Sequence, residues 1–565
     1  QRLLPIRHNR RGPAVAVSDL NGDGRDDICF GGTTLDAARL AVLAPPGKFL
    51  VQSLEGSPGP TNDGPVLIFD INGDGRDDVL LTRGGAGLWD GSAEYQPQIY
   101  LNLNGGLERT PQTRLPPLRF SVGAAVAADW DRNGTLDVFL GGRLLPGEYP
   151  LAPASALLSN EHGQFIDVTG SVAPELDHVG MVTGALWTDV DGDGWVDLLV
   201  AVEWSGIRYF HNDRGQRLED WSRRAGFEAA GTGWWSAIAA ADFNGDGRMD
   251  YAVGNVGQNT PYQADSQHPA LLFYGDFGGS EGAQIIEARH DGNRIVPWRS
   301  RKELGAVLPS ILKVFPKNDM FARQSLDAIL GADKIAAARR FAATEFRSGI
   351  FLSQPDGSFR FEALPRLAQI APIYGLVAGD FDGDGFADLC AAQNSYAPVP
   401  SIGRFGGGIG QFIRGDGKGG FLAAPPAESG FLVSGDGKGL AVADLDQDGW
   451  PDFIVTRNNA ANLVFKNRGV AGRHSFGVVL QGGPGNPRAV GARITVELAD
   501  GNRRVGEVQA GGGHMSQSTA TCHFGYADNN PPRRVTIRWP DGRTTTESIE
   551  DRALPAVLTF KSEAK

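Results

Sequence analysis

One nine-residue pattern, Asp-x-[Asp/Asn]-x-[Asp/Asn]-Gly-x-x-Asp, occurs seven times and constrains the fold of this chain more than any other feature. The copies begin at residues 19, 70, 129, 189, 242, 380 and 444. Successive starts are 51 to 64 residues apart, except for one gap of 138 residues. Self-similarity at such a period is typical of a repeat architecture.

The pattern predicts a calcium site in each loop. Calcium takes six to eight oxygen ligands at about 2.3–2.6 Å, whereas carboxylates crowded together without a cation repel one another. Side chains at positions 1, 3, 5 and 9 and the backbone carbonyl of position 7 would surround one ion, and glycine at position 6 permits the turn. We therefore expect about seven structural Ca²⁺ ions. The predicted ligands are Asp19, Asn21, Asp23, Arg25, Asp27, Asp70, Asn72, Asp74, Arg76, Asp78, Asp129, Asp131, Asn133, Thr135, Asp137, Asp189, Asp191, Asp193, Trp195, Asp197, Asp242, Asn244, Asp246, Arg248, Asp250, Asp380, Asp382, Asp384, Phe386, Asp388, Asp444, Asp446, Asp448, Trp450 and Asp452.

The flanks of the loops predict strands. An EF-hand needs a glutamate at position 12 and helices on both sides, but position 12 is apolar here, as at Phe30 and Leu81. Each loop should therefore join the first two strands of a four-stranded sheet. Seven such sheets arranged radially form an all-β, seven-bladed β-propeller, which we expect over residues 1–470. Residues 1–8 could supply the missing outer strand of the last sheet.

The long gap between the fifth and sixth loops predicts an insertion in blade 5, at residues 256–348. Apolar residues recur at helical spacing between residues 302 and 346, so part of the insertion should be helical. From residue 471 the chain shows alternating strands without acidic loops. This change predicts a small, β-sandwich-like domain over residues 471–565.

The loops and their apolar flanks resemble FG-GAP/VCBS repeats, the type found in the integrin α-subunit propeller, over about residues 10–470. The C-terminal part, with "GNPRAVGARITVELADG" and "VTIRWPDGR", resembles an ASPIC/UnbV domain. This order of domains is typical of cartilage-acidic-protein-like chains. ASPIC/UnbV proteins are also similar to chains linked to enediyne biosynthesis, and that resemblance implies an accessory role as one alternative.

The formal net charge of −13 depends on what the acidic loops hold. Seven Ca²⁺ ions would add 14 positive charges and nearly neutralise the chain, so we do not expect an acidic steering surface. No basic patch indicates nucleic-acid binding. No apolar run approaches the roughly 20 residues that a membrane span needs, and the start at Gln1 without a signal-like segment is expected of a processed mature form or a trimmed chain.

A ligand site is expected on the face opposite the calcium hairpins, because loops there gather aromatic, amide and charged side chains. Such side chains suit a glycan or a protein ligand, through stacking and hydrogen bonding. The alternative is that the aromatic residues fill a narrow central channel. The candidate ligand-binding residues are Arg143, Glu203, Trp204, Trp234, Trp235, Asn255, Tyr262, Tyr374, Asn394, Tyr396 and Arg457.

Catalysis is the alternative use of that face. No nucleophile elbow, zinc-protease motif, P-loop or Cys–His pair is present. A polysaccharide lyase or sugar dehydratase would need an acid–base pair, for which His178 and Tyr374 are the candidates. The remaining histidines of interest are expected to be bystanders or structural: His162, His211, His514 and His523.

These features together predict a calcium-binding propeller that works as a binding or adhesion protein, secreted or periplasmic. Millimolar extracellular calcium would fill weak oxygen sites that cytosolic calcium would leave empty. Three cysteines are too few for a disulfide framework, and Cys29 and Cys390 are expected to be buried thiols.

Overall fold

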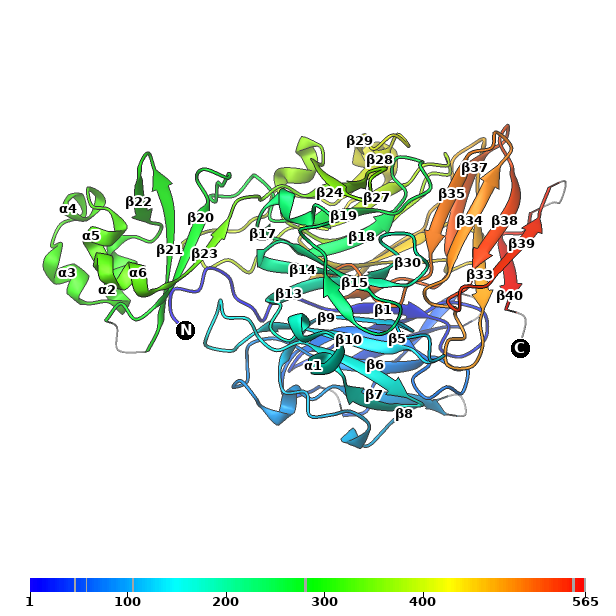
Figure 1. The fold of residues 1–565 in the computed structure, drawn as a ribbon, viewed down its shortest axis with the longest axis horizontal. Helices are drawn as coiled ribbons and strands as arrows, with labels where there is room; N and C mark the ends of the chain where they lie inside the picture. Colours follow the sequence, from blue (N-terminus) through cyan, green and yellow to red (C-terminus); the bar gives the residue numbers. More distant parts are fainter. Residues whose placement is uncertain (45–46, 57, 104–105, 279–281, 551–553, 563–565) are drawn as a thin grey trace.

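The computed structural model of the chain consists mainly of β-strands, which confirms the predicted all-β class (Figure 1). The strands of the described residues form ten sheets. In the part of the chain that is described, no helix is both long and apolar enough to cross a bilayer. The described residues are 1–44, 47–56, 58–103, 106–278, 282–550 and 554–562.

Seven of the sheets begin with an acidic hairpin, as predicted. In each, the loop joins two antiparallel strands. The first strands are β1 (Val15–Ser18), β5 (Asp63–Phe69), β9 (Ser121–Ala128), β13 (Met181–Thr188), β18 (Ala237–Ala241), β26 (Ile373–Gly379) and β30 (Asp436–Ala443). The second strands are β2 (Asp27–Phe30), β6 (Asp78–Arg83), β10 (Asp137–Leu144), β14 (Asp197–Ser205), β19 (Asp250–Gly254), β27 (Asp388–Gln393) and β31 (Asp452–Asn458).

Outer strands complete these sheets. The third strands are β3 (Arg39–Ala44), β7 (Gln98–Leu103), β11 (Ala156–Glu161), β15 (Ile207–Asn212), β24 (Gly349–Ser353), β28 (Gln411–Gly415) and β32 (Leu463–Phe465). The fourth strands are β4 (Lys48–Ser53), β8 (Gly106–Arg109), β12 (Gln164–Asp167), β16 (Leu218–Asp220), β25 (Phe359–Ala363) and β29 (Phe421–Ala424), and the short β17 (Gly233–Trp234) pairs with β14.

The last of the seven sheets has three strands among the described residues, β30, β31 and β32. The prediction that residues 1–8 complete it is wrong. Arg7 N–H donates to the Ala397 carbonyl (3.0 Å), and Ile6 forms an isolated bridge with Pro398. These contacts hold the N-terminal segment beside the loop that follows β27.

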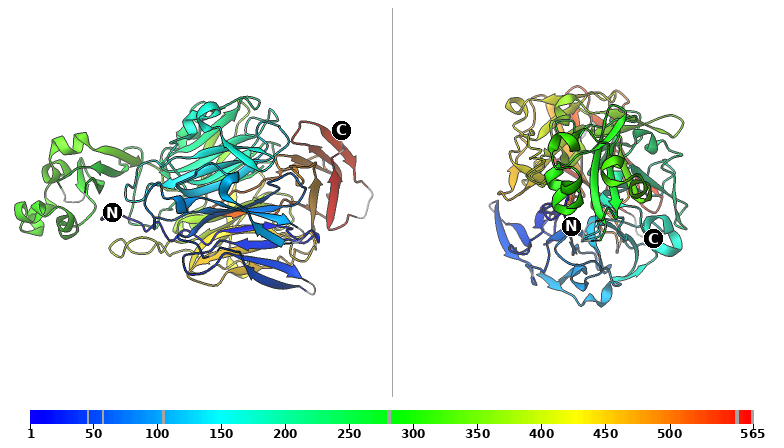
Figure 2. Two further views of the ribbon diagram at one scale, coloured as in Figure 1. Left: turned by 90° about the horizontal axis from the view of Figure 1, so that it is seen from below. Right: turned by 90° about the vertical axis from the view of Figure 1, so that its left-hand side faces the viewer.

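The first strands contact one another in a closed order: β1, β5, β9, β13, β18, β26, β30 and again β1. We call this closed series of first strands the strand ring. Figure 2 (right) shows the molecule with the insertion toward the viewer and the ring behind it. Small residues allow the close approach. A Cβ atom on Gly123 would lie 2.0 Å from the Val182 carbonyl oxygen of the next first strand. Glycine in a strand often marks such a backbone approach.

The insertion, shown in green at the left of Figure 1, forms a sheet and five short helices. Helix residues Leu304, Ile311 and Phe321 pack with Phe273 and Ile286 of its sheet, so the insertion has a core of its own. Its elements are β20 (Ala270–Gly275), β21 (Gln284–Asp291), β22 (Arg294–Pro297), α2 (Arg301–Val307), α3 (Ser310–Val314), α4 (Asn318–Ala322), α5 (Leu326–Leu330), α6 (Ala332–Ala337) and β23 (Arg339–Ala343). The other helices are α1 (Thr169–Val172) and α7 (Pro426–Ser429).

The C-terminal strands lie at the opposite end of the molecule, at the right of Figure 1. They form one sheet in the order β37-β33-β40 and another in the order β35-β34-β38-β39. Their bounds are β33 (Arg473–Gln481), β34 (Arg493–Leu498), β35 (Arg503–Glu507), β36 (Ser516–Gln517), β37 (Cys522–Ala527), β38 (Pro532–Arg538), β39 (Thr544–Ser548) and β40 (Val557–Lys561).

Residues 509–519, which we call the central segment, leave the C-terminal sheets and enter the strand ring. Within the segment, β36 pairs in parallel with β1. The Gln517 amide donates to the Ile68 carbonyl and accepts from the Ile68 N–H, both at 2.8 Å. Further backbone hydrogen bonds join Ala510 to Ala127 of β9, Gly513 to Ile238 of β18 and Thr519 to Val442 of β30.

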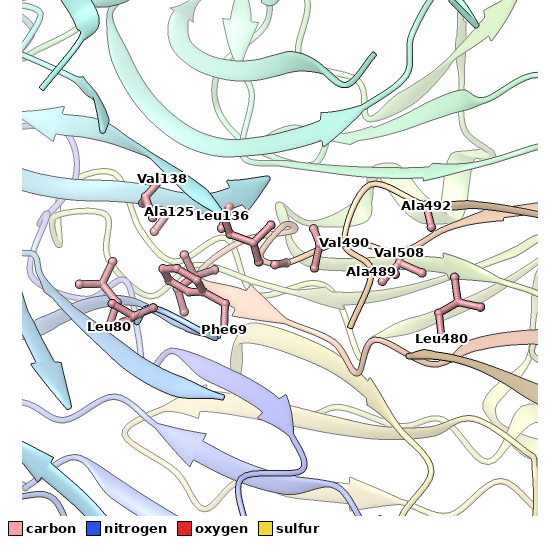
Figure 3. Close-up of a cluster of buried hydrophobic side chains, with 14 of the residues drawn as sticks. Phe69, Leu80, Ala125, Leu136, Val138, Leu480, Ala489, Val490, Ala492 and Val508 are labelled. Carbon is pink, nitrogen blue, oxygen red and sulfur yellow. The ribbon is translucent and has the colours of Figure 1, made fainter. Parts of the chain in front are cut away.

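The C-terminal sheets also share a hydrophobic core with the two sheets that begin with β5 and β9. Phe69, Leu80 and Leu136 belong to the same buried cluster as Val490 and Val508 (Figure 3). Burial of apolar surface contributes roughly 25 cal/mol per Å², so this contact stabilises both parts. The predicted boundary at residue 470 therefore does not separate two independent cores.

Candidate metal centres and central pocket

All seven acidic loops have the same local architecture. The N–H of the glycine at position 6 donates to the carboxylate at position 1, over distances between 2.7 and 3.2 Å. Each of these glycines has a positive φ, from 82° to 99°. Only glycine adopts that conformation readily, which explains the glycine in every copy.

The aspartate at position 9 fixes each loop to its own sheet. In the first loop, Asp27 accepts from Leu43 N–H of the third strand (2.9 Å) and from Leu20 N–H of the loop (3.2 Å). The bond to the third strand recurs in every loop, between 2.7 and 3.0 Å. In every loop but the third, the position-9 carboxylate also accepts from the N–H of position 2, so two donors hold it in place independently of any metal.

Carboxylate oxygens converge in four of the loops. In each of these, one oxygen from each of three aspartates lies within 4.8 Å of the others. The groups are Asp129, Asp131 and Asp137; Asp189, Asp191 and Asp193; Asp380, Asp382 and Asp388; and Asp444, Asp446 and Asp452. Asparagine replaces aspartate at position 3 of the other three loops, at Asn21, Asn72 and Asn244.

Buried carboxylate oxygens without a hydrogen-bond donor support a cation in these loops. Asp129 Oδ1, Asp137 Oδ2 and Asp189 Oδ1 have no partner. Burial, with the charge of Asp131, raises the pKa of Asp137 to about 9 and that of Asp129 to about 7. A buried anion without a donor is costly, and a hard cation with oxygen ligands would relieve that cost. The donor set fits such an ion.

Several loops also receive cationic side chains, some of them from the C-terminal sheets. Arg473 contacts Asp382, Arg538 contacts Asp189, and Lys466 contacts Asp446. The acidic hairpins therefore face the C-terminal sheets, and part of their charge is neutralised by the protein itself.

His211, expected to be a bystander, lies against the fourth loop. Its Nδ1 is 3.2 Å from Asp191 Oδ2 and 3.3 Å from Asp197 Oδ1. Burial alone would lower the pKa of His211, but Asp197 and Asp191 raise it. The ring stacks on Trp221, with centroids 3.7 Å apart. The prediction that His211 is a bystander is therefore wrong, because β15, the third strand of this sheet, places its side chain against the fourth acidic loop.

Asparagines at the ends of third strands connect neighbouring sheets, and sequence analysis missed them. The Asn160 amide donates to the carbonyl of Ile71 in the preceding loop (3.0 Å) and to that of Leu136 in its own loop (3.1 Å). The signal was an asparagine in several of the outer-strand fragments, as in "YLNLNGG" and "YFHNDRG". The residues with this role are Asn102, Asn160, Asn212 and Asn467.

A central pocket of about 60 Å³ lies on the side of the strand ring away from the acidic loops. Arg143 and Glu203 form a buried ion pair at its wall. Tyr149 O–H donates to Glu203 Oε1 (2.7 Å), and Trp204 Nε1–H donates to Tyr149 Oη (2.6 Å). Burial alone would raise the pKa of Glu203, but Arg143 lowers it below its usual value.

The N-terminal segment covers this pocket. His8 is buried, with its ring 4.8 Å from that of Tyr149. Burial, assisted by the charge of Arg143, lowers the pKa of His8 to about 3, so the ring is neutral. Arg11 donates to the backbone carbonyls of Val122 (3.2 Å) and Gly123 (3.1 Å). Burial and the neighbouring Arg143 lower the pKa of Arg11 to about 9.

The structure brings six of the eleven candidate ligand residues to this pocket. They are Arg143, Glu203, Trp234, Trp235, Asn255 and Tyr374. Two more, Trp204 and Tyr262, pack against Trp234 with ring centroids 5.2 and 4.9 Å away. These eight residues, apart from the half-buried Tyr374, are buried. An open stacking surface made of them is therefore not formed, because the N-terminal segment and the loops cover them.

The remaining three candidates lie elsewhere. The Asn394 amide donates to the Gly408 and Gly435 carbonyls, and the Arg457 guanidinium donates to the Ser434 and Ala461 carbonyls. Arg404 lies over the ring of Tyr396 at 4.7 Å. Each of the three is engaged by its own loop neighbours.

The two catalytic candidates are not brought together. His178 is 62% exposed and its Nδ1 lies 3.1 Å from Asp177 Oδ2, whereas Tyr374 lines the central pocket beside His514. Burial raises the pKa of Tyr374 to about 12. The structure therefore forms no acid–base pair from these residues.

Sequence comparison matches two families. The FG-GAP-like repeat matches residues 19–81, 70–140 and 189–253, and "ASPIC and UnbV" matches residues 482–565. Cartilage acidic protein 1 of Homo sapiens is 21% identical over 539 residues, which cover 83% of this chain and 76% of that protein. The protein of the same name in Xenopus tropicalis is 23% identical over 504 residues, which cover 78% and 74%.

Two solved structures are similar at a low level. The Vibrio cholerae biofilm matrix protein Bap1 is 15% identical with a TM-score of 0.32, over 81% of this chain and 77% of that one. The rhamnogalacturonan lyase YesW is 14% identical with a TM-score of 0.26, over 82% and 91%. At these scores the likenesses carry no argument about this chain.

Proposed function

We propose that this chain, which carries FG-GAP-like repeats and a C-terminal ASPIC and UnbV domain, is a calcium-stabilised β-propeller that works as a binding or adhesion protein. The seven ring sheets would be its blades, over residues 1–470, with residues 256–348 inserted in blade 5. Residues 471–565 would form the appended β-domain. The closed order of contacts between first strands supports a sevenfold ring.

Calcium is the proposed ion in the acidic loops, with about seven sites in total. The observation that carries this proposal is the set of buried, donor-free oxygens of Asp129, Asp137 and Asp189. All the side-chain ligands at positions 1, 3, 5 and 9 are oxygen donors, which calcium prefers over nitrogen or sulfur. When bound, the ion would neutralise the loop carboxylates and hold the first two strands of each sheet together.

A structural rather than catalytic role for the ions follows from the position of the loops. The acidic hairpins face the C-terminal sheets, and arginines from those sheets contact Asp382 and Asp189. A catalytic metal needs an open position toward substrate, which this covered side does not favour. The ligand, a glycan or a protein, is instead proposed to use the opposite side, where the central pocket lies.

A location outside the cytosol suits these sites. Loops with weak affinity fill at millimolar calcium, as in extracellular modules, but stay largely empty at cytosolic concentrations. The relatives named cartilage acidic protein 1 match over most of the chain. A secreted or periplasmic location is therefore the proposal for this protein.

Metal counting combined with unfolding tests the proposal. The protein is dialysed against 1 mM CaCl₂ or against a chelator, and bound metal is measured by mass spectrometry. We expect about seven calcium ions per chain and a lower melting temperature after chelation, since a site at a tenfold excess of ligand over Kd contributes about 1.4 kcal/mol. A protein that binds no calcium and melts identically with chelator would refute it. A glycan array with the calcium-loaded protein then tests the ligand class.

A further inference from the structure

The central pocket is lined by more positive charge than its own carboxylate balances. Arg11 and Arg143 both line the pocket, and Glu203 is the carboxylate that pairs with Arg143. Arg11 contacts backbone carbonyls, and among the described residues no carboxylate lies within ion-pair distance of it. His8 and His514, whose pKa values are lowered by burial, add no charge. Arg7 and Arg10 also line the pocket, so its lining carries an excess of positive charge.

Hydrogen-bond donors at the pocket are also unused. Arg143 is buried, and its Nε and Nη1 groups have no partner. Trp234 Nε1 and His8 Nε2 are likewise buried, with no partner among the described residues. A neutral imidazole can present an N–H at that nitrogen in one of its tautomers. Buried donors without a partner are destabilising, so a ligand that accepts from them would be favoured.

Size and lining narrow the ligand class. The volume of about 60 Å³ equals that of about two water molecules, since each takes about 30 Å³ in the liquid. Ile6, Val256 and Phe405 add apolar side chains to the lining of the pocket. A planar anion with two oxygens and a short apolar end would suit this lining. Its oxygens would bind the arginines, because arginine binds carboxylates through parallel N–H donors, and its apolar end would contact the apolar side chains.

We propose that the central pocket binds one small monocarboxylate with a short apolar end, such as acetate, between Arg143 and Arg11 beneath the N-terminal segment. This inference deepens the proposed binding function and depends on it for the location of the site. The carboxylate would supply the missing negative charge and accept from the unused donors of Arg143. The N-terminal segment would then act as the cover of an occupied site.

Calorimetric titration of the calcium-loaded protein with acetate tests this inference at constant ionic strength. Acetamide is the matched neutral probe, with similar shape and no charge, and chloride is the spherical monovalent probe. We expect saturable 1:1 binding of acetate, at least tenfold weaker binding of chloride and no binding of acetamide. Absence of acetate binding, equal binding of acetamide or equal binding of chloride would each overturn the carboxylate site.

Variants connect the binding to the pocket. Arg11→Gln should weaken acetate binding at least tenfold, whereas Arg366→Gln, an exposed arginine outside the pocket, should leave it unchanged. Arg143→Met combined with Glu203→Gln removes the ion pair without leaving a buried charge and should abolish binding. Wild-type affinity in both pocket variants would overturn the proposal. Calcium content and melting temperature of the same samples separate this result from failure of the proposed function.

Discussion

Replacing Gln517 by methionine should destabilise the whole protein, because this side chain joins the central segment to the strand ring. Gln517 is 6% exposed and exchanges two hydrogen bonds of 2.8 Å with the backbone of Ile68 in β5. Methionine has nearly the same length and fills the same space, so the change isolates the hydrogen bonds. The Ile68 N–H and carbonyl, in a fully buried strand, would be left without partners.

The magnitude follows from those two groups. A buried donor or acceptor left unsatisfied costs about 1–3 kcal/mol, so two should lower the free energy of unfolding by about 2–5 kcal/mol. Urea unfolding in 1 mM CaCl₂ measures the change, and hydrogen exchange of residues 63–69 should become faster. Gln52→Met, at an exposed position of β4, is the matched control. A midpoint for Gln517→Met equal to that of the control would refute the proposed coupling.

Three further predictions address the other contacts. Asn160→Ala should lower the free energy of unfolding by about 2–4 kcal/mol, because the Ile71 and Leu136 carbonyls lose their donor. Urea unfolding measures this change against the exposed control Asn502→Ala, and equal midpoints for the two variants would contradict it. Asp137→Asn should reduce the bound calcium by one ion per chain, counted by mass spectrometry, while Asp356→Asn in an outer turn should not, so an unchanged count would exclude Asp137 as a ligand. A chain that ends at residue 470 should lose cooperative thermal unfolding, because the cluster around Phe69 and Leu136 becomes exposed; a sharp transition like that of the full chain would contradict the shared core.

Short-range sequence signals predicted much of this structure. The acidic loops and their flanking strands were predicted correctly. The acidic residues that mark each loop and the apolar residues that mark its strands lie within a few positions of one another, as in "AVAVSDLNGDGRDDICF". The helical insertion followed from apolar spacing in the same way. Cys29 and Cys390 are buried thiols, as expected.

Long-range contacts were not predictable in this way. Gln517 and Ile68 are 449 residues apart, and "GGGHMSQST" has no strand periodicity that would indicate pairing with β1. The burial of Trp234 and Trp235 depends on segments distant in the sequence, including the N-terminal cover, so the sequence left an exposed ligand surface and a filled central channel as alternatives. The role of His211 likewise depends on how far β15 returns toward the fourth loop.

The parallel pairing of β1 with β36 has a consequence for biosynthesis. β1 waits for a partner strand that is synthesised about five hundred residues later. At roughly 5–20 residues per second, the first sheet would spend tens of seconds with its inner edge unpaired. Exposed strand edges promote association with other chains, so a chaperone or slow early folding would protect the nascent protein until its last hundred residues emerge.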